Sequence, residues 1–380
     1  MIPQANPKAS YLAHREAIDA GIRRVLESGW FLVGQELAAF EKEFAEYVGC
    51  AHGVGVASGT DAIELALRGV GVGTGDIVFT VSHTAVATVA GIERAGATPV
   101  LVDIDAESYT MDPASLDQAI QALGARSSAV AGTPRAVLPV HLYGHPADLG
   151  AIAEIAQRHQ LVLIEDCAQA HGAMLDGRRL GAFGLASAFS FYPTKNLGAI
   201  GDGGLVVTSS EAVAERLRML REYGWRERYV SDIPGVNSRL DEIQAAILRA
   251  KLPHLDADNA RRRAIAALYD RSLTAGHLTK PVTRRDRTHV FHQYVVRSAS
   301  RDELRDYLKA HGVGTLVHYP VPVHLQPAYR DRLPRVVPLQ ATERAAREVV
   351  SLPMFPELPP HDVATVIERL NTWPGLSVAR

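Results

Sequence analysis

The sequence predicts an α/β fold with a large, mainly parallel sheet in one lobe and a smaller α+β lobe after it. The chain has 380 residues, 47% of them hydrophobic, which is enough for two packed lobes. Short apolar runs alternate with amphipathic helical stretches, a pattern typical of parallel sheets covered on both faces. After Pro253 a long arginine-rich helical stretch begins. We therefore expect a large lobe at residues 1–252, including an N-terminal segment, and a small lobe at residues 253–380.

The periodicity of apolar residues predicts the individual elements in order. Two N-terminal helices are expected around a glycine-bounded turn, at residues 11–28 and 35–48. The strands of the large sheet are expected at residues 77–81, 99–103, 136–141, 161–165, 186–192 and 204–208, with helices such as 87–95, 149–159 and 211–222 between them. In the small lobe we expect a helix at residues 259–273, a strand-helix-strand unit at 290–297, 301–311 and 313–319, and helices at 342–350 and 361–371.

Composition argues against several classes of partner. A net charge of −2 removes nucleic acid as the default partner. Cys50 and Cys167 are the only cysteines, so neither a disulfide framework nor a cysteine-based metal site is expected, and we expect no metal. The sequence has no run of about eighteen apolar residues and does not start with a leader-like segment. We therefore expect a cytoplasmic protein with no membrane partner.

Lys195 is the first candidate for chemistry. It lies in the stretch FSFYPTKNLG at residues 189–198, where an apolar strand runs into a tight turn. A lysine beside an apolar strand loses hydration of its charged form, so its pKa falls and the free amine becomes available as a nucleophile. Schiff-base formation with a carbonyl compound is the commonest use of such an amine. Taken alone, an ordinary surface lysine at a strand end is the alternative.

Ser58, Gly59, Thr60 and Asp61 stand just before an apolar helical run. Free backbone N–H groups and the helix dipole make such a helix start a phosphate site. A plain Ser/Thr/Asp helix cap explains the same residues equally well.

Asp166 follows an apolar run that predicts a buried parallel strand. Ligands bind beyond the carboxyl ends of such strands, so an acid at this position lies at the ligand edge of the sheet. Its desolvation requires a compensating cation, and a protonated pyridinium nitrogen supplies one. From Asp166 alone, a magnesium ligand or a structural ion pair remains an alternative.

These three features together match the requirements of pyridoxal 5′-phosphate (PLP), namely a phosphate site, a partner for the ring nitrogen and a Schiff-base lysine. The motifs SGTDA, EDCAQAHGA and FSFYPTKNLG also make the chain similar to the sugar aminotransferases of the DegT/DnrJ/EryC1/StrS group. The resemblance covers nearly the full length. It implies the PLP-dependent transferase fold type I, which is aspartate-aminotransferase-like.

The resemblance also implies roles for single residues. The expected catalytic residues are Lys195 and Asp166, and Asn237 is expected to reach the phosphate of the neighbouring subunit in a homodimer. The expected cofactor-binding residues are Ser58, Gly59, Thr60, His83, Asp166, Gln169, Ser190, Lys195 and Asn237. The expected substrate-binding residues are Trp30, Phe31, Tyr192, Arg239, His318, Tyr319 and His324, although a packing plug is the alternative for the first two and a structural histidine for His318 and His324.

One position departs from the pattern of the family. The family usually carries an aromatic residue over the cofactor ring shortly after the strand predicted at residues 77–81, and this sequence has Ala85 there. We expect His83 or another group to cover that face of the ring.

The implied reaction has two stages. Glutamate loads the cofactor as pyridoxamine 5′-phosphate (PMP), and a nucleotide-linked keto-sugar then accepts the amino group. The favoured acceptor is a dTDP-linked 3-keto-6-deoxyhexose, with 4-keto-sugars and scyllo-inosose as alternatives. A related dehydratase is disfavoured because those proteins replace the lysine with histidine. A non-catalytic regulatory protein of the same fold is a further alternative, but such a protein has no need for Lys195.

Overall fold

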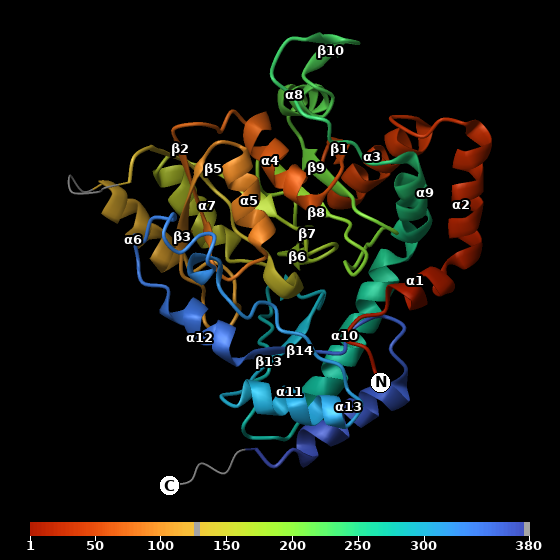
Figure 1. Ribbon diagram of the computed structural model, residues 1–380, viewed down its shortest axis with the longest axis vertical. Coiled ribbons are helices and arrows are strands. Elements are labelled where there is room, and N and C mark those ends of the chain that lie inside the picture. The colour runs from red at the N-terminus through yellow and green to blue at the C-terminus, as the bar shows by residue number, and fades with distance from the viewer. Residues whose placement is uncertain (125–129, 376–380) are drawn as a thin grey trace.

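The computed structural model describes residues 1–124 and 130–375, and its centre is a seven-stranded sheet (Figure 1). Its strands are β1 (His52–Val56), β2 (Asp76–Val81), β3 (Thr98–Val102), β4 (Thr133–Val137), β5 (Val162–Asp166), β8 (Ala186–Ser190) and β9 (Gly204–Thr208). In space the order is β1-β9-β8-β5-β4-β2-β3. The strands from β8 to β3 run parallel, whereas β9 is antiparallel to both of its neighbours. The predicted α/β class with a mainly parallel sheet is confirmed.

The sheet strands lie close to where the apolar runs placed them. All five residues of β8 and of β9 are buried, as expected for strands covered on both faces. The strand β8 ends at Ser190, two residues earlier than predicted, because the chain turns there toward Lys195. The strand β1, with the sequence HGVGV, was not predicted. Its two glycines approach neighbouring groups closely: a Cβ on Gly53 would lie 2.5 Å from the carbonyl oxygen of Glu41.

Helices cover both faces of the sheet (Figure 1). One face packs against α4 and α8, and the other face packs against α3 and α9 at one end and α6 and α7 at the other. The helices before residue 252 are α1 (Pro7–Ala13), α2 (Arg15–Ser28), α3 (Gln35–Val48), α4 (Gly59–Gly69), α5 (Val86–Arg94), α6 (Pro113–Gly124), α7 (Leu149–Arg158), α8 (Glu211–Arg221) and α9 (Glu242–Lys251). Short strands and 3-10 turns complete this part: β6 (Met174–Leu175), β7 (Arg178–Arg179), β10 (Trp225–Glu227), β11 (Val230–Ser231), η1 (Leu142–Gly144) and η2 (Leu252–His254).

A second hydrophobic core lies below the sheet in Figure 1. This core is formed by α10 (Leu255–Ser272), β13 (Tyr294–Arg297), α11 (Arg301–Ala310), β14 (Val349–Leu352) and α13 (Pro360–Thr372). The other elements of this part of the chain are β12 (Arg287–Thr288), η3 (Val323–Leu325) and α12 (Gln340–Glu348). The N-terminus joins this part of the molecule, because Ile2 exchanges backbone hydrogen bonds of 2.8 Å with Gly312 and Gly314. The lobe boundary at residue 252 stays a prediction.

One predicted strand of the small lobe is wrong. Residues 313–319 form only single bridges, from Val313 to Ile2 and from Leu316 to Ser351. The partner of β13 is instead β14, which is buried along its whole length and pairs with β13 at four positions. The predicted helix at residues 342–350 accordingly ends at Glu348, where the chain becomes extended.

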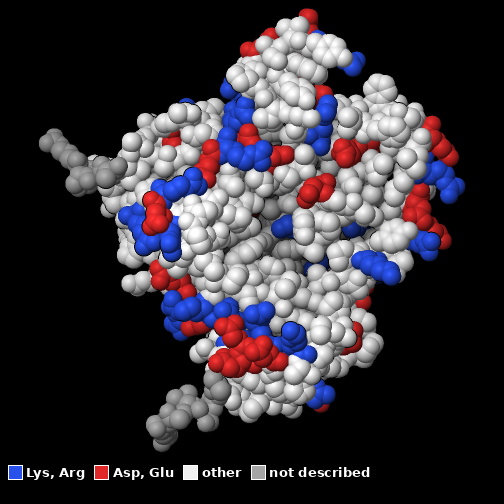
Figure 2. Space-filling model, in the orientation of Figure 1, with Lys and Arg blue, Asp and Glu red and all other residues white. Residues whose placement is uncertain are grey.

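Figure 2 shows that charged side chains gather toward the rim of this face, while the middle, between the sheet and the small lobe, is hollowed and mostly uncharged. Among the described helices, none is both long enough and apolar enough to cross a membrane.

Candidate active site

Lys195 lies on the turn after β8, and its amino group is enclosed by protein although the residue as a whole is half-buried. The turn folds back on the strand end, because the N–H groups of Lys195 and Ala199 donate to the carbonyls of Tyr192 and Phe191, each at 2.8 Å. Burial lowers the pKa of Lys195 to about 8, and the charge of Asp166 acts in the opposite direction. Part of the Lys195 population therefore carries the uncharged amine near neutral pH, which is the form that acts as a nucleophile.

Asp166 is the last residue of β5 and is almost fully buried. One carboxylate oxygen accepts from the hydroxyl of Thr88 at 2.9 Å, and the other accepts from the N–H of Ala168 at 3.1 Å. Burial nevertheless raises the pKa of Asp166, because two hydrogen bonds and Lys195 do not replace the lost hydration. The site therefore favours an additional cation next to this carboxylate.

The start of α4 lies against the end of β8. Ser58 caps the helix by accepting from the N–H of Asp61 at 3.1 Å. A Cβ on Gly59 would lie 2.5 Å from Cβ of Ser190, so only glycine allows this approach. The contact brings the hydroxyl of Ser190 beside the helix start that carries Thr60, where the first amide N–H groups of a helix are free to bind an anion.

The segment that carries Asn237 is fixed to the same helix. The hydroxyl of Ser238 accepts from the N–H of Ala57 at 3.0 Å and donates to Asp61 at 2.8 Å. Asn237 itself is exposed, and Arg239 is half-buried.

A hydrogen-bond network joins four of the predicted residues through Tyr143. The N–H of Tyr143 donates to Oε1 of Gln169 at 2.7 Å, and Nε2 of Gln169 donates to the hydroxyl of Tyr319 at 3.1 Å. The hydroxyl of Tyr143 lies 2.9 Å from Nε2 of His83 and donates to the carbonyl of His318. The structure thus brings His83, Gln169, His318 and Tyr319 together.

This network fixes the protonation of His83. The single proton of the Tyr143 hydroxyl goes to the carbonyl of His318, so Nε2 of His83 must donate to Tyr143. Burial lowers the pKa of His83 to about 4, so the ring is neutral and Nδ1 carries no proton. Among the described residues this buried Nδ1 has no hydrogen-bond partner, which leaves an acceptor for a bound group.

Sequence reasoning missed Tyr143 and Thr88. Tyr143 lies two residues after the predicted strand 136–141, so its place near a strand end was a usable signal. Its left-handed backbone, with φ of 60°, is not evident from the residue type. Thr88 lies one turn into α5, and nothing in its sequence neighbourhood indicates a contact with Asp166.

His324 links the sheet to the small lobe. Its Nδ1 lies 2.7 Å from the hydroxyl of Ser82, its Nε2 lies 3.3 Å from Glu343, and its backbone N–H donates to Ser82 at 3.1 Å. The carboxylate of Glu343 can only accept, so Nε2 carries the proton of the neutral ring, and Nδ1 accepts from the hydroxyl of Ser82. Both ring nitrogens are thus used within the protein, and a contact of His324 with substrate stays a prediction.

Three predicted substrate-binding residues lie on the surface. Trp30 is 63% exposed, Phe31 51% and Tyr192 53%. Trp30 borders a groove between α2 and α3, next to Gly34. Tyr192 starts the turn of Lys195, whose N–H it accepts.

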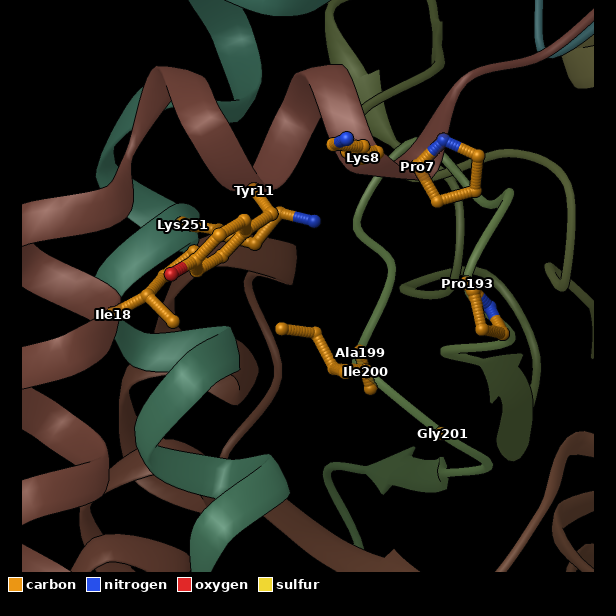
Figure 3. A pocket seen from close by; sticks show the side chains of 9 residues that line it. All are labelled: Pro7, Lys8, Tyr11, Ile18, Pro193, Ala199, Ile200, Gly201 and Lys251. Carbon is orange, nitrogen blue, oxygen red and sulfur yellow. The ribbon is translucent and has the colours of Figure 1, made fainter.

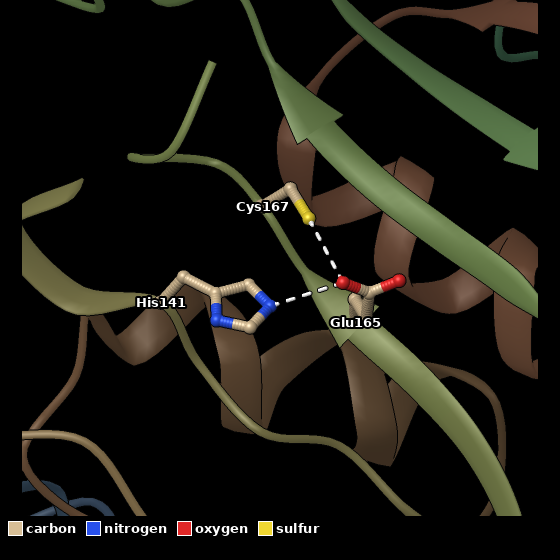
Figure 4. Close-up of side chains that lie close together, drawn as sticks. All are labelled: His141, Glu165 and Cys167. Carbon is tan, nitrogen blue, oxygen red and sulfur yellow. Dashed lines mark hydrogen bonds and ion pairs between the residues drawn. The ribbon is translucent and has the colours of Figure 1, made fainter. Parts of the chain in front are cut away.

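A buried cluster of His141, Glu165 and Cys167 lies beside Asp166 (Figure 4). Glu165 accepts from His141 at 3.2 Å, from three backbone N–H groups in loop 181–185 at 2.8 to 2.9 Å, and from the hydroxyl of Ser187 on β8 at 3.1 Å. Nδ1 of His141 accepts from the N–H of Ala147 at 3.0 Å, so Nε2 carries the proton. Both carboxylate oxygens therefore serve to anchor the loop next to the end of β5.

A cavity of about 550 Å³ lies behind the turn of Lys195 (Figure 3). Tyr11 and Ile18 line it from the N-terminal helices, and Ile200 lines it from the turn. At its edge the ammonium of Lys251 donates to the carbonyl of Gly198 at 2.6 Å. The turn of Lys195 is thus held from this side as well.

The sheet edge therefore combines a lysine with an enclosed amino group, a buried acid, a helix start flanked by hydroxyls and an imidazole nitrogen that has no partner among the described residues. These donors and acceptors fit PLP, and together with the fold they define a PLP-dependent transferase of fold type I.

Comparison with known proteins identifies the family. The model of the DegT/DnrJ/EryC1/StrS aminotransferase family matches residues 13–371, and the chain belongs to this family. The chain is 50% identical to the dTDP-3-amino-3,4,6-trideoxy-α-D-glucose transaminase of Streptomyces venezuelae, over 98% of this chain and 96% of that protein. It is also 50% identical to the erythromycin biosynthesis sensory transduction protein EryC1 of Saccharopolyspora erythraea, over 94% of this chain and 95% of that protein.

Solved structures agree. The crystal structure of Streptomyces venezuelae DesV superposes with a TM-score of 0.92 at 49% identity and covers 98% of each chain. The protein is a PLP-dependent sugar aminotransferase, which confirms the predicted fold type, enzyme class and cofactor.

Proposed function

We propose that this enzyme transfers an amino group from glutamate to C3 of a dTDP-linked 3-keto-6-deoxyhexose in deoxyaminosugar biosynthesis. The observation that carries the proposal is the 50% identity, over nearly the whole chain, with a transaminase named for a dTDP-linked 3-amino sugar. The amino group at C3 of the product in that name corresponds to a keto group at C3 of the acceptor, and the named product is also deoxygenated at C4 and C6.

The cofactor would be held mainly at its phosphate and its ring nitrogen. Its phosphate would bind at the start of α4, with Ser58, Gly59, Thr60 and Ser190 around it, and the partner's Asn237 would complete this site. The close approach of Gly59 to Ser190 and the exposure of Asn237 support this arrangement. Gln169 and His83 would contact the ring from the network around Tyr143.

When bound, PLP supplies a protonated pyridine ring that accepts the electron pair left when a proton leaves the carbon next to the amino group. Asp166 holds the proton on the ring nitrogen, since a buried carboxylate with incomplete compensation is stabilised by that cation. Nζ of Lys195 would take the proton that leaves the carbon next to the amino group and would later return a proton. Its pKa of about 8 suits both tasks near neutral pH.

Tyr319 would donate to the substrate. Nε2 of Gln169 is fixed as a donor because Oε1 accepts from Tyr143, so the hydroxyl of Tyr319 accepts from Gln169 and keeps its own proton free. The remaining proposed substrate contacts are Trp30, Phe31, Tyr192, Arg239, His318 and His324.

An acceptor panel tests the proposal. Purified enzyme with glutamate is given dTDP-3-keto-6-deoxyglucose or its galactose epimer, dTDP-4-keto-6-deoxyglucose, a UDP-4-keto-hexosamine or scyllo-inosose, and a parallel series replaces glutamate by glutamine. We expect the highest kcat/KM with a dTDP-linked 3-keto sugar and glutamate. Lys195→Ala is the inactive control, and borohydride reduction should attach the cofactor to Lys195 in the wild type. Activity confined to scyllo-inosose, or a reduced adduct on another lysine, would overturn the proposal.

The proposed homodimer has a sharper test than sedimentation alone. If each site combines Lys195 of one subunit with Asn237 of the other, a heterodimer of Lys195→Ala and Asn237→Ala chains contains one intact site. Mixing the two impaired variants after reversible dissociation should therefore restore activity. Continued inactivity of a verified heterodimer would show that Asn237 does not act across the interface.

A further inference from the structure

Five buried polar side chains form a row that includes Asn196, the residue next to Lys195. The members in order are Gln4, Gln293, His292, Asn196 and Asn259. The row runs from the N-terminal segment to α10, and each member is at most 8% exposed. The gap between Nε2 of Gln293 and Nε2 of His292 is 3.3 Å, and Nδ1 of His292 lies 3.2 Å from Oδ1 of Asn196. Nδ2 of Asn196 donates to Oδ1 of Asn259 at 2.7 Å, and Nε2 of Gln4 donates to Gln293 at the other end.

At the α10 end of the row, backbone carbonyls fix how the side-chain amides of Asn196 and Asn259 are oriented. Nδ2 of Asn259 donates to the carbonyl of His171 at 2.8 Å, and Nδ2 of Asn196 donates to the carbonyl of Val290 at 3.1 Å. A carbonyl only accepts, so Oδ1 of Asn196 must face His292. Nδ1 of His292 therefore carries the proton.

The contacts of Gln4 and Gln293, at the other end of the row, independently indicate the same tautomer of His292. Nε2 of Gln4 also faces the carbonyl of Leu352, at 3.5 Å, so Gln4 presents N–H groups to Oε1 of Gln293. Nε2 of Gln293 then donates to His292, which requires a bare Nε2 on that ring. Both ends thus demand a neutral His292 protonated on Nδ1.

The surroundings of His292 support this state. Burial holds its pKa well below the usual value. The positive charges of Lys195 on the catalytic turn and of Arg262 on α10 act in the same direction. A neutral imidazole can therefore persist across the working pH range of the enzyme.

We propose that His292 is a positioning residue for the amino transfer: through Asn196 it fixes the turn that carries Lys195, and the row ties this turn to the N-terminal segment. The inference rests on the proposed role of Lys195. Lys251 holds the same turn at Gly198, from the side of the cavity in Figure 3. A displacement of a catalytic group by about 1 Å costs on the order of 10²-fold in rate.

Replacing His292 by Leu or by Asn separates positioning from packing. The two side chains are similar in size, but Asn can place an N–H where Nδ1 donates to Asn196, whereas Leu cannot. We expect His292→Leu to lower kcat by about tenfold to a hundredfold with little change in KM. His292→Asn should restore most of this loss. A packing role predicts the reverse order, because Leu is the better filler of a buried site.

A second measurement does not depend on turnover. In cofactor-free protein, the pH dependence of Lys195 labelling by an amine-reactive reagent reports its pKa, which is about 8. Loosening the turn admits water, so His292→Leu should move the midpoint upward, toward the ordinary value of 10.5. His292→Asn should stay near the wild type.

His289→Phe is the matched control. His289 is also a buried histidine, but its Nδ1 accepts from the nearby N–H of Phe291 at 2.9 Å and it stands outside the row. We expect it to leave kcat and the labelling midpoint unchanged. If His292→Leu does not fold, Gln293→Leu breaks the adjacent link and should shift both readouts in the same direction.

The outcomes distinguish the two proposals. Unchanged kcat and an unchanged midpoint in His292→Leu or Gln293→Leu would overturn the positioning role, as would equal losses in the Leu and Asn variants. A borohydride adduct away from Lys195 in the wild type would instead overturn the proposed function.

Discussion

Replacing Lys195 by methionine should stabilise the cofactor-free protein at neutral pH. The pKa of Lys195 falls from 10.5 to about 8 on folding, which corresponds to about 3 kcal/mol of unfavourable free energy for the buried ammonium. Below pH 8 both the folded and the unfolded chain hold this proton, so the full cost is present. Between pH 8 and 10.5 the folded chain loses the proton first, so wild-type stability rises with pH, and the cost is gone above 10.5. Methionine removes the charge and keeps an unbranched side chain.

Thermal unfolding measures this difference. For 380 residues the unfolding entropy is roughly 0.8 kcal/mol/K, so about 3 kcal/mol corresponds to about 4 °C in Tm. We expect Lys195→Met to melt about 4 °C above the wild type at pH 7, and the gap to close as pH approaches 10.5. Lys42→Met, at an exposed lysine, should have little effect at any pH. Equal melting temperatures at pH 7, or a gap that does not change with pH, would refute the reasoning.

Three further substitutions test other parts of the site. Gly59→Ala should destabilise the fold by about 1–3 kcal/mol and weaken PLP binding in a cofactor titration, because the new Cβ would overlap Ser190; unchanged affinity would remove the phosphate assignment. Tyr319→Phe should lower kcat on the order of tenfold or more without loss of Tm, since among the described residues the hydroxyl only accepts, from Gln169, and its own proton is not used within the protein; wild-type kcat would contradict that role. Glu165→Gln should cost several kcal/mol in denaturant unfolding, because an amide N–H₂ then faces backbone donors; near-normal stability would show that loop 181–185 does not need the carboxylate.

The sequence predicts best those site residues that stand at the ends of parallel strands. Asp166 follows the apolar run predicted at residues 161–165, and Lys195 comes three residues after the run predicted at residues 186–192. In a parallel sheet these carboxyl ends share one edge, so finding the strands already places the chemistry. Thr60 at a helix start follows from the same kind of local reasoning.

Contacts set by distant parts of the chain could not be predicted in this way. The hydrogen bond from Thr88 to Asp166 joins residues 78 positions apart, and the irregular backbone of Tyr143 has no local signature. The choice of β14 over residues 313–319 as partner of β13 is likewise decided by tertiary packing. His292 was not singled out, because its role depends on side chains from three other segments.

The place of the N-terminal segment sets an order for assembly during synthesis. Gln4 leaves the ribosome early, but its partner Gln293 lies 289 residues further along the chain. At a synthesis rate of about 5–20 residues per second, roughly 15–60 s pass between the synthesis of Gln4 and that of Gln293. The large sheet can form during this interval, whereas the support of the catalytic turn by Gln4 cannot. A nascent chain should therefore gain its sheet well before it gains a fully supported active site.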